Sequence, residues 1–202
     1  MAKPMIRNSR RRDHAFTLIE MIGVLAVVAI LAALLIPKIF ESINNARISQ
    51  AVLSCQTIKT AVLEHYSKFQ SLNSSNGLPL SVPNGNFDAV LLAEGLIDKP
   101  FSVAIAGSAT IELVSATSGP ATGASGTAFD LDGDGNGDLS VGQYVVEARL
   151  FNVSLSDARA LNAILDGAAL GEDANGNDFA GRVIYRKPAT NPRTVYIYLT
   201  HH

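Results

Sequence analysis

The densest group of metal-type ligands in this sequence lies between residues 130 and 138. Oxygen-bearing side chains stand at every second position, as Asp130, Asp132, Asp134, Asn136 and Asp138. A glycine at position 135 allows the sharp turn that the sixth residue of a calcium loop makes. Four crowded carboxylates repel one another, so a cation would stabilise the loop. The spacing therefore predicts a Ca2+ site formed by these five residues.

This loop differs from an EF-hand at its twelfth position, where Val141 stands in place of the bidentate glutamate. Residues 144–151, which follow it, alternate like a strand and not like the exit helix of an EF-hand. Glu147 or backbone oxygens are the available sources of a further ligand. The alternative is an acidic surface loop that holds no ion. A second acidic stretch, residues 172–178, is a weaker cation candidate and is explained equally well as an Asn/Gly/Asp turn.

A single carboxylate, Glu20, interrupts a long apolar segment. Residues 16–36 contain no other charged side chain, and about 20 apolar residues suffice to cross a bilayer as a helix. A carboxylate within such a segment is costly and usually marks a functional site. The alternative is that Glu20 lies at the interfacial end of an anchor helix, where lipid headgroups solvate it.

The residues before this segment predict its orientation. Only one acidic residue, Asp13, accompanies five basic residues there: Lys3, Arg7, Arg10, Arg11 and Arg12. The positive-inside rule then keeps the N-terminus in the cytoplasm and exports the residues after position 36. A cleaved secretory signal explains the segment less well, because its apolar core spans only ~7–15 residues.

The exported part is acidic. Without residues 1–15 the chain carries 11 Lys and Arg against 17 Asp and Glu, a net charge of −6. We therefore expect no general nucleic-acid binding. The one cysteine, Cys55, cannot form an intramolecular disulfide, so a bound cation would be the substitute cross-link.

The region of residues 9–60 resembles the type IV prepilins and the pseudopilins of type II secretion. A basic leader ends at Ala15, and the motif Phe16-Thr17-Leu18-Ile19-Glu20 opens the apolar helix. The resemblance implies that a prepilin peptidase cuts between Ala15 and Phe16 and that the new amine of Phe16 is methylated. The family most often carries glycine where Ala15 stands here. It usually places a helix-breaking proline at the position of Pro37.

The resemblance also implies a role for Glu20 in assembly. The amine that cleavage gives to Phe16 is a cation, and in a filament the amine of an incoming subunit can pair with Glu20 of a neighbour. This pairing would fix the register, because an unpaired buried charge costs several kcal/mol. The implied partners are other pilins in a homo- or hetero-oligomeric filament, the prepilin peptidase/methyltransferase, the membrane and an inner-membrane assembly platform.

One long helix over residues 16–69 is expected to carry these sites. Residues 16–36 are apolar on all sides and form its transmembrane or filament-core half. Residues 37–69 are amphipathic, with apolar side chains from Phe40 and Ile43 onward at spacings of three and four. Pro37 should kink the helix. Turn-forming residues at 71–77 end it.

Residues 70–202 predict a globular head that contains the acidic loop 130–138. Helices are expected at 86–97 and 154–165, strands at 103–105, 110–114, 144–151, 183–186 and 194–199, and an exposed, mobile loop at 115–127. In the last strand Val195, Ile197 and Leu199 form one aliphatic face. The predicted fold class is α+β and type IV pilin-like, with the long N-terminal helix packed against a small antiparallel β-sheet.

Together these features predict a structural filament subunit and not an enzyme, because no catalytic motif is present. The leading interpretation is a type IV pilin that serves adhesion, motility or DNA uptake. One alternative is a pseudopilin of a type II secretion system. Another is a monomeric, membrane-anchored calcium-binding protein with an uncleaved leader. The expected location is the bacterial inner membrane, as a single pass, and then a cell-surface or periplasmic filament.

Overall fold

The structure is a computed structural model that describes residues 17–117, 128–167, 170–186 and 193–202. The expected leader with Ala15, the first mature residue Phe16, and most of the expected loop at 115–127 lie outside the described residues. The chain divides into two compact units, residues 1–43 and 44–202.

The first unit is the beginning of α1 (Leu18–Phe69), a single helix of 52 residues. This confirms the predicted long helix. Pro37 lies inside α1, and the chain is helical on both sides of it. The kink expected at Pro37 stays a prediction. By length and composition α1 is able to cross a membrane, and its most apolar window has no buried residue.

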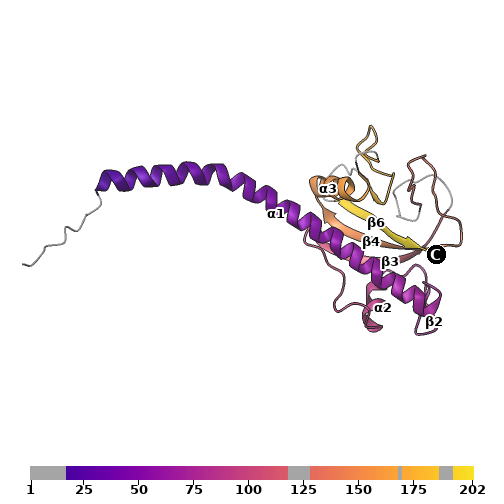
Figure 1. The fold of residues 1–202 in the computed structure, drawn as a ribbon. Coiled ribbons are helices and arrows are strands. Elements are labelled where there is room, and N and C mark those ends of the chain that lie inside the picture. The colour runs from indigo at the N-terminus through magenta and orange to yellow at the C-terminus, as the bar shows by residue number, and fades with distance from the viewer. Residues whose placement is uncertain (1–16, 118–127, 168–169, 187–192) are drawn as a thin grey trace, which may run out of the picture. The chain divides into compact units, whose positions relative to one another are not determined.

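The second unit contains an antiparallel sheet with the strand order β3-β4-β6-β5, and the later part of α1 lies along one face of it (Figure 1). Its strands are β3 (Ser108–Ser115), β4 (Tyr144–Val153), β5 (Val183–Tyr185) and β6 (Arg193–His201). The helix α3 (Leu155–Leu165) follows β4, and the hydroxyl of Ser154 caps it by accepting from the backbone N–H of Asp157. The α+β class is therefore confirmed.

The main core lies between α1 and this sheet. On β6, Val195, Ile197 and Leu199 face it, as their alternation predicted. The residues of α1 that are buried recur at spacings of three and four: Ile48, Ala51, Val52, Cys55, Ile58, Ala61, Val62 and His65. This stripe begins at Ile48. Phe40 and Ile43, which the pattern also placed on the buried side, are 67% and 44% exposed.

Shorter elements cover the end of α1. A β-hairpin is formed by β1 (Ser74–Ser75) and β2 (Leu78–Pro79), which are joined by a turn of two residues, Asn76 and Gly77. Both turn residues have positive φ, as a tight hairpin turn with the Asn-Gly pair requires. The helix α2 (Phe87–Ala93) is shorter than the one expected at 86–97. The strand expected at 103–105 is wrong, since those residues form a coil and β3 begins at Ser108.

A second, smaller core lies on the opposite face of the sheet. Val145 and Tyr196 contribute to it from the sheet, and Phe129 and Leu139 cover them from the segment that contains the acidic loop. The acidic loop is thus fixed to the sheet at both of its ends by buried side chains.

Candidate functional site

The carboxylate of Glu20 closes the first turn of α1. Its Oε2 atom accepts hydrogen bonds of 2.8 Å from both the backbone N–H and the hydroxyl of Thr17. In return, the backbone N–H of Glu20 donates to Thr17 Oγ1 at 3.3 Å. This reciprocal pair is a capping box, which stabilises a helix start by satisfying free N–H groups. In the single chain, Glu20 therefore has a structural partner within three residues.

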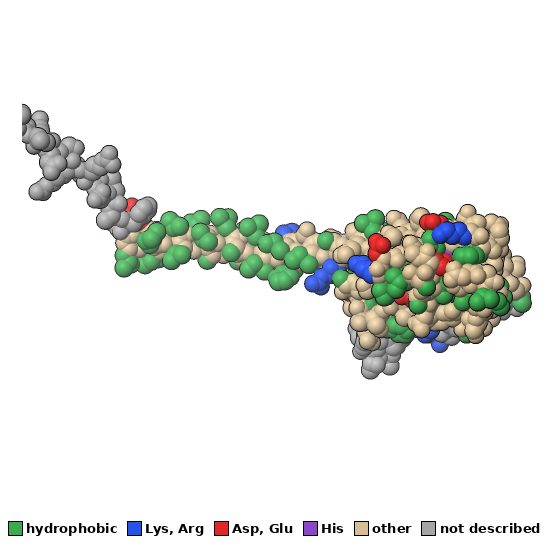
Figure 2. Space-filling view, turned by 90° about the horizontal axis from the view of Figure 1, so that it is seen from below, with side chains coloured by type: hydrophobic (Ala, Val, Ile, Leu, Met, Phe, Trp, Pro, Cys, Tyr) green, Lys and Arg blue, Asp and Glu red, His purple; other side chains and the backbone are tan. Residues whose placement is uncertain are grey.

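The surface around Glu20 is unusual for an isolated chain, because it is almost wholly apolar and exposed. Leu18 and Ile19 are 78% and 73% exposed, and large apolar side chains stay exposed along the first unit up to Phe40. Figure 2 shows these side chains as a continuous apolar surface along the helix. Exposed apolar surface of this extent marks a membrane or protein contact.

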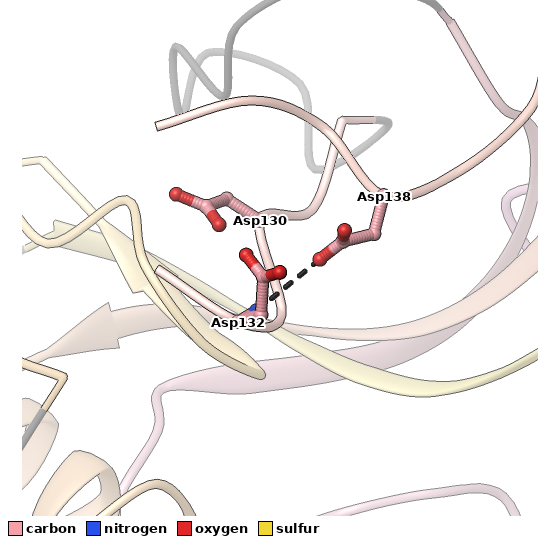
Figure 3. A group of neighbouring side chains, drawn as sticks. All are labelled: Asp130, Asp132 and Asp138. Atoms are coloured by element: carbon pink, nitrogen blue, oxygen red, sulfur yellow. Dashed lines mark hydrogen bonds between the residues drawn. The ribbon is translucent and has the colours of Figure 1, made fainter. Parts of the chain in front are cut away.

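In the acidic loop the structure brings three of the five predicted ligands together. Asp130, Asp132 and Asp138 each offer a carboxylate oxygen, and these atoms lie within 4.8 Å of one another (Figure 3). Asp130 is buried, whereas Asp132 and Asp138 are exposed. The carboxylate of Asp134 is not part of this group. Three oxygens at this separation suit a hard cation such as Ca2+.

Backbone N–H groups of the loop already bind two of these carboxylates. Asp130 Oδ1 accepts from Gly133 at 2.7 Å, and its Oδ2 accepts from Gly135 at 2.9 Å. Asp138 Oδ2 accepts from Leu131 at 2.5 Å and from Asp132 at 3.2 Å. Gly133 and Gly135 both have positive φ, near +82° and +90°. The loop therefore folds around its acids, which stay able to coordinate through their remaining lone pairs.

The loop is also joined to a distant part of the head. The backbone carbonyl of Asp130 accepts from the N–H of Gly181 at 2.6 Å. A Cβ atom at Gly133 would overlap the side chain of Leu170. Both contacts lie in the segment between α3 and β5, so the acidic loop contributes to the packing of that segment.

Neither the twelfth position of the loop nor Glu147 joins the three carboxylates. Val141, at the twelfth position of the loop, is exposed. Glu147 lies within β4, is fully buried and is not in the carboxylate group. Of the two suggested sources of a further ligand, Glu147 is thus held in the sheet outside the carboxylate group, which leaves backbone oxygens as the alternative.

The second acidic stretch uses its carboxylates for internal contacts. Asp173 Oδ1 accepts from the N–H groups of Asn175 and Asn177, both at 2.8 Å. Glu172 accepts from Arg159 at 2.8 and 2.6 Å and from the Tyr185 hydroxyl at 3.0 Å. These contacts lower the pKa of Glu172, with the Arg159 hydrogen bonds as the main cause. Glu172 and Asp173 thus make the local contacts of a turn, and cation binding by this stretch stays a prediction.

Sequence reasoning missed one buried polar contact. His65 Nδ1 lies 2.6 Å from Glu94 Oε2, and the two side chains are 0% and 2% exposed. The sequence does indicate that His65 is buried, because His65 continues the spacing of Ile58 and Val62 on the buried face of α1. A polar side chain on such a face needs a polar partner.

Comparison with known proteins places the N-terminal segment. Residues 10–36 match the family described as the prokaryotic N-terminal methylation motif. The chain is 33% identical over 100 residues to the type IV major pilin protein PilE1 of Neisseria gonorrhoeae, which covers 42% of the chain and 61% of that protein. It is 39% identical over 72 residues to a fimbrial protein of Neisseria meningitidis serogroup A. This match covers 34% of the chain and 42% of that protein.

The chain spans about three fifths of the first relative's length and less than half of the second's. No solved structure matches it. The match at residues 10–36 contains Thr17, Glu20 and most of the exposed apolar surface of α1. The N-terminal region of this chain therefore matches the prokaryotic N-terminal methylation motif.

Proposed function

We propose that this chain, with the N-terminal region of a type IV prepilin, is a structural subunit of a type IV pilus-like filament. The observation that carries the proposal is the start of α1 up to Ile36, where Glu20 is the one carboxylate in an apolar surface that the described residues leave uncovered. The membrane covers this surface before assembly, and the helices of other subunits cover it afterwards. The filament serves adhesion, motility or DNA uptake.

Processing prepares the helix for assembly. A prepilin peptidase/methyltransferase removes the leader, residues 1–15, by cutting between Ala15 and Phe16, and methylates the amine of Phe16. Until then residues 16–36 span the inner membrane with the N-terminus in the cytoplasm. An assembly platform in that membrane then transfers the subunit to the filament. The head, residues 70–202, forms the filament surface.

Glu20 acts in this proposal as the assembly residue. Its Oε2 atom is bound by Thr17 in the single chain, and a carboxylate has lone pairs for additional partners. The Phe16 amine of a neighbouring subunit can therefore pair with it while the capping box persists. Such a pair would neutralise two charges that apolar helices enclose.

A pilus is a better-supported setting than a secretion pseudopilus. The relatives at 33% and 39% identity carry the names of a major pilin and a fimbrial protein. The assignment to a pilus rests on this similarity, which covers 42% and 34% of the chain.

We also propose that the acidic loop binds Ca2+ through Asp130, Asp132 and Asp138. The support is the convergence of three carboxylate oxygens within 4.8 Å and the positive φ of Gly133 and Gly135, which lets the loop curve around a small centre. The ion would stabilise the packing of the segment from Leu170 to Gly181, since that segment contacts the loop.

The assembly proposal is tested by Glu20→Gln in the full-length chain, with Glu41→Gln as the matched control. Glu41 lies on the same helix, and its contact with Lys38 is exposed. We expect both variants to insert and be cleaved, but only Glu41→Gln to enter filaments. Mass spectrometry of the mature N-terminus and electron microscopy of sheared filaments measure these outcomes. Filaments that contain Glu20→Gln at the wild-type level would contradict the pairing role.

A further inference from the structure

The face of the sheet opposite α1 contains a buried carboxyl group, that of Glu147. Along β4, Val146, Ala148 and Leu150 point into the main core, so Glu147 and Arg149 point to the other side. Glu147 has no exposed surface, and neither of its carboxylate oxygens has a hydrogen-bond partner among the described residues. Buried polar groups without partners are rare and need a physical explanation.

The strand register identifies the groups around Glu147. On β3 its direct partner is Glu112, and on β6 it is Tyr198. Arg149 lies two residues along β4, but its Nη1 atom donates to both oxygens of Glu112 at 2.8 Å. The Tyr198 hydroxyl contacts His201 Nδ1. The Arg149 guanidinium is therefore bound to Glu112 and the Tyr198 hydroxyl to His201, and neither is hydrogen-bonded to Glu147.

The cover over this face is apolar. Phe129 packs edge-on against Tyr198, with ring centroids 5.4 Å apart, and both Phe129 and Leu139 are buried. An ionised Glu147 would thus place a second negative charge beside Glu112 without water to solvate it. The charge of Arg149 balances only one carboxylate, so the layer is neutral when one of the two glutamates holds a proton.

We propose that the folded head holds Glu147 as the neutral acid, and that loss of this proton loosens the segment 129–139 from the sheet at alkaline pH. Burial raises the pKa of Glu147 to about 8, the charge of Glu112 raises it too, and Arg149 opposes the shift. The acid is therefore neutral at pH 7 in the folded head and ionised at that pH in the unfolded chain.

The sign of the pH effect follows from proton binding. Between the usual pKa of 4.5 and the folded value of about 8, the folded state binds more protons than the unfolded state. Stability from this group is complete below the unfolded pKa and is lost as the pH rises through the folded pKa. The contribution of Glu147 to the stability of the head should therefore fall as the pH rises from 4.5 to about 8.

The experiment uses the full-length chain in detergent with a chelator present, so that the acidic loop does not contribute. Infrared spectroscopy measures the carbonyl band of a protonated carboxylic acid between pH 5 and 10. We expect the band at pH 6 to be stronger in the wild type than in Glu147→Gln, where Asp178 still contributes, and we expect this difference to vanish well above pH 8. Glu64→Gln, at an exposed position on α1, should leave the band unchanged. Bands of equal strength in the wild type and Glu147→Gln at pH 6 would overturn the proposal.

Two further measurements test the mechanism. In Glu112→Gln, Arg149 becomes free to pair with Glu147, so the band at pH 6 should fall to its strength in Glu147→Gln. Thermal unfolding should show that Glu147→Gln removes a loss of about 5 °C that the wild type suffers between pH 6 and 9. Hydrogen exchange at Phe129 and Leu139 should accelerate over the same range. An identical pH dependence in wild type and Glu147→Gln would contradict the proposal.

Discussion

His65 and Glu94 form a buried contact that joins α1 to the end of α2. The distance between Nδ1 and Oε2 is 2.6 Å, and Ser75 donates a second hydrogen bond to Glu94 at 3.3 Å. Phe69 and Phe87 pack against the imidazole, with ring centroids 5.0 and 5.4 Å away. Because water is excluded on these sides, the two polar side chains depend on each other.

Loss of one partner of this contact should therefore be costly. We expect His65→Leu to destabilise the head by about 3–5 kcal/mol, because it leaves the Glu94 carboxylate buried without its main partner. The double variant His65→Leu/Glu94→Leu should recover part of the loss, since no buried charge remains. Thermal unfolding of the full-length chain in detergent measures both.

An exposed pair provides the control for this prediction. Lys68 lies 3.8 Å from Glu64 on the surface of α1, and Lys68→Ala should cost less than about 1 kcal/mol. A loss in His65→Leu no larger than that in Lys68→Ala would show that burial does not strengthen the contact.

Gly181 makes a second prediction, because its backbone and its surroundings both exclude a side chain. Its φ is +89°, and a Cβ atom would lie 2.6 Å from Cγ of Asp166. Asp166 is itself held by the N–H of Val183 at 2.8 Å and by Arg182. Gly181→Ala should thus destabilise the head by more than about 2 kcal/mol, through both backbone strain and overlap.

Gly95→Ala separates these two causes. Gly95 also has positive φ, +70°, but a Cβ atom there would meet no atom within 4 Å. Its variant should cost only the backbone term of about 1 kcal/mol. Equal losses in both variants, measured by thermal unfolding, would exclude a steric contribution from Asp166.

The long helix and the strands of the head could be predicted because their patterns are local. The apolar run after Phe16 and the alternation of Val195, Ile197 and Leu199 follow directly from chain geometry. The start of the buried stripe could not, because Phe40 and Ile48 have the same character in the sequence. Only the position at which the head begins to cover α1 distinguishes them.

The candidate sites also depend on tertiary structure that local sequence patterns do not specify. Spacing placed five oxygen ligands in one loop, yet the backbone turns Asp134 away so that its Oδ1 accepts from the N–H of Asn136 at 2.8 Å. The spacing of Thr17 and Glu20 is that of a capping box, but we assigned Glu20 to assembly from the sequence and did not predict this contact. The isolation of Glu147 depends on strand register, which the sequence does not specify residue by residue.

The geometry of the acidic loop predicts unequal roles for its aspartates. If Ca2+ binds where three oxygens converge, Asp132→Asn should weaken binding at least tenfold. Asp134→Asn, at an equally exposed position outside the group, should weaken it much less. Isothermal titration of the full-length chain with CaCl2 in detergent measures both. Equal loss in the two variants would instead support the five-ligand arrangement of the sequence pattern.

Asp178 predicts a pH dependence of a different part of the head. It has no exposed surface and pairs through its backbone with Tyr185. Burial raises the pKa of Asp178 to about 7, and the charges of Asp166, Glu172 and Asp173 also raise it. From the usual value of 3.8 to about 7, the folded state therefore binds more protons than the unfolded state. Stability from this group is complete below pH 3.8 and falls as the pH rises.

Asp178→Asn should remove this loss, because the amide stays neutral at every pH. At pH 8 we expect the variant to be more stable than the wild type by at least about 1 kcal/mol, and at pH 4 to be equal or less stable. Asp157→Asn, at the first turn of α3, controls for a general change in charge. The difference between variant and wild type in thermal unfolding from pH 4 to 8 isolates Asp178 from carboxylates such as Glu172, whose lowered pKa acts in the opposite direction. A constant difference over this range would mean that Asp178 is ionised in the folded head throughout.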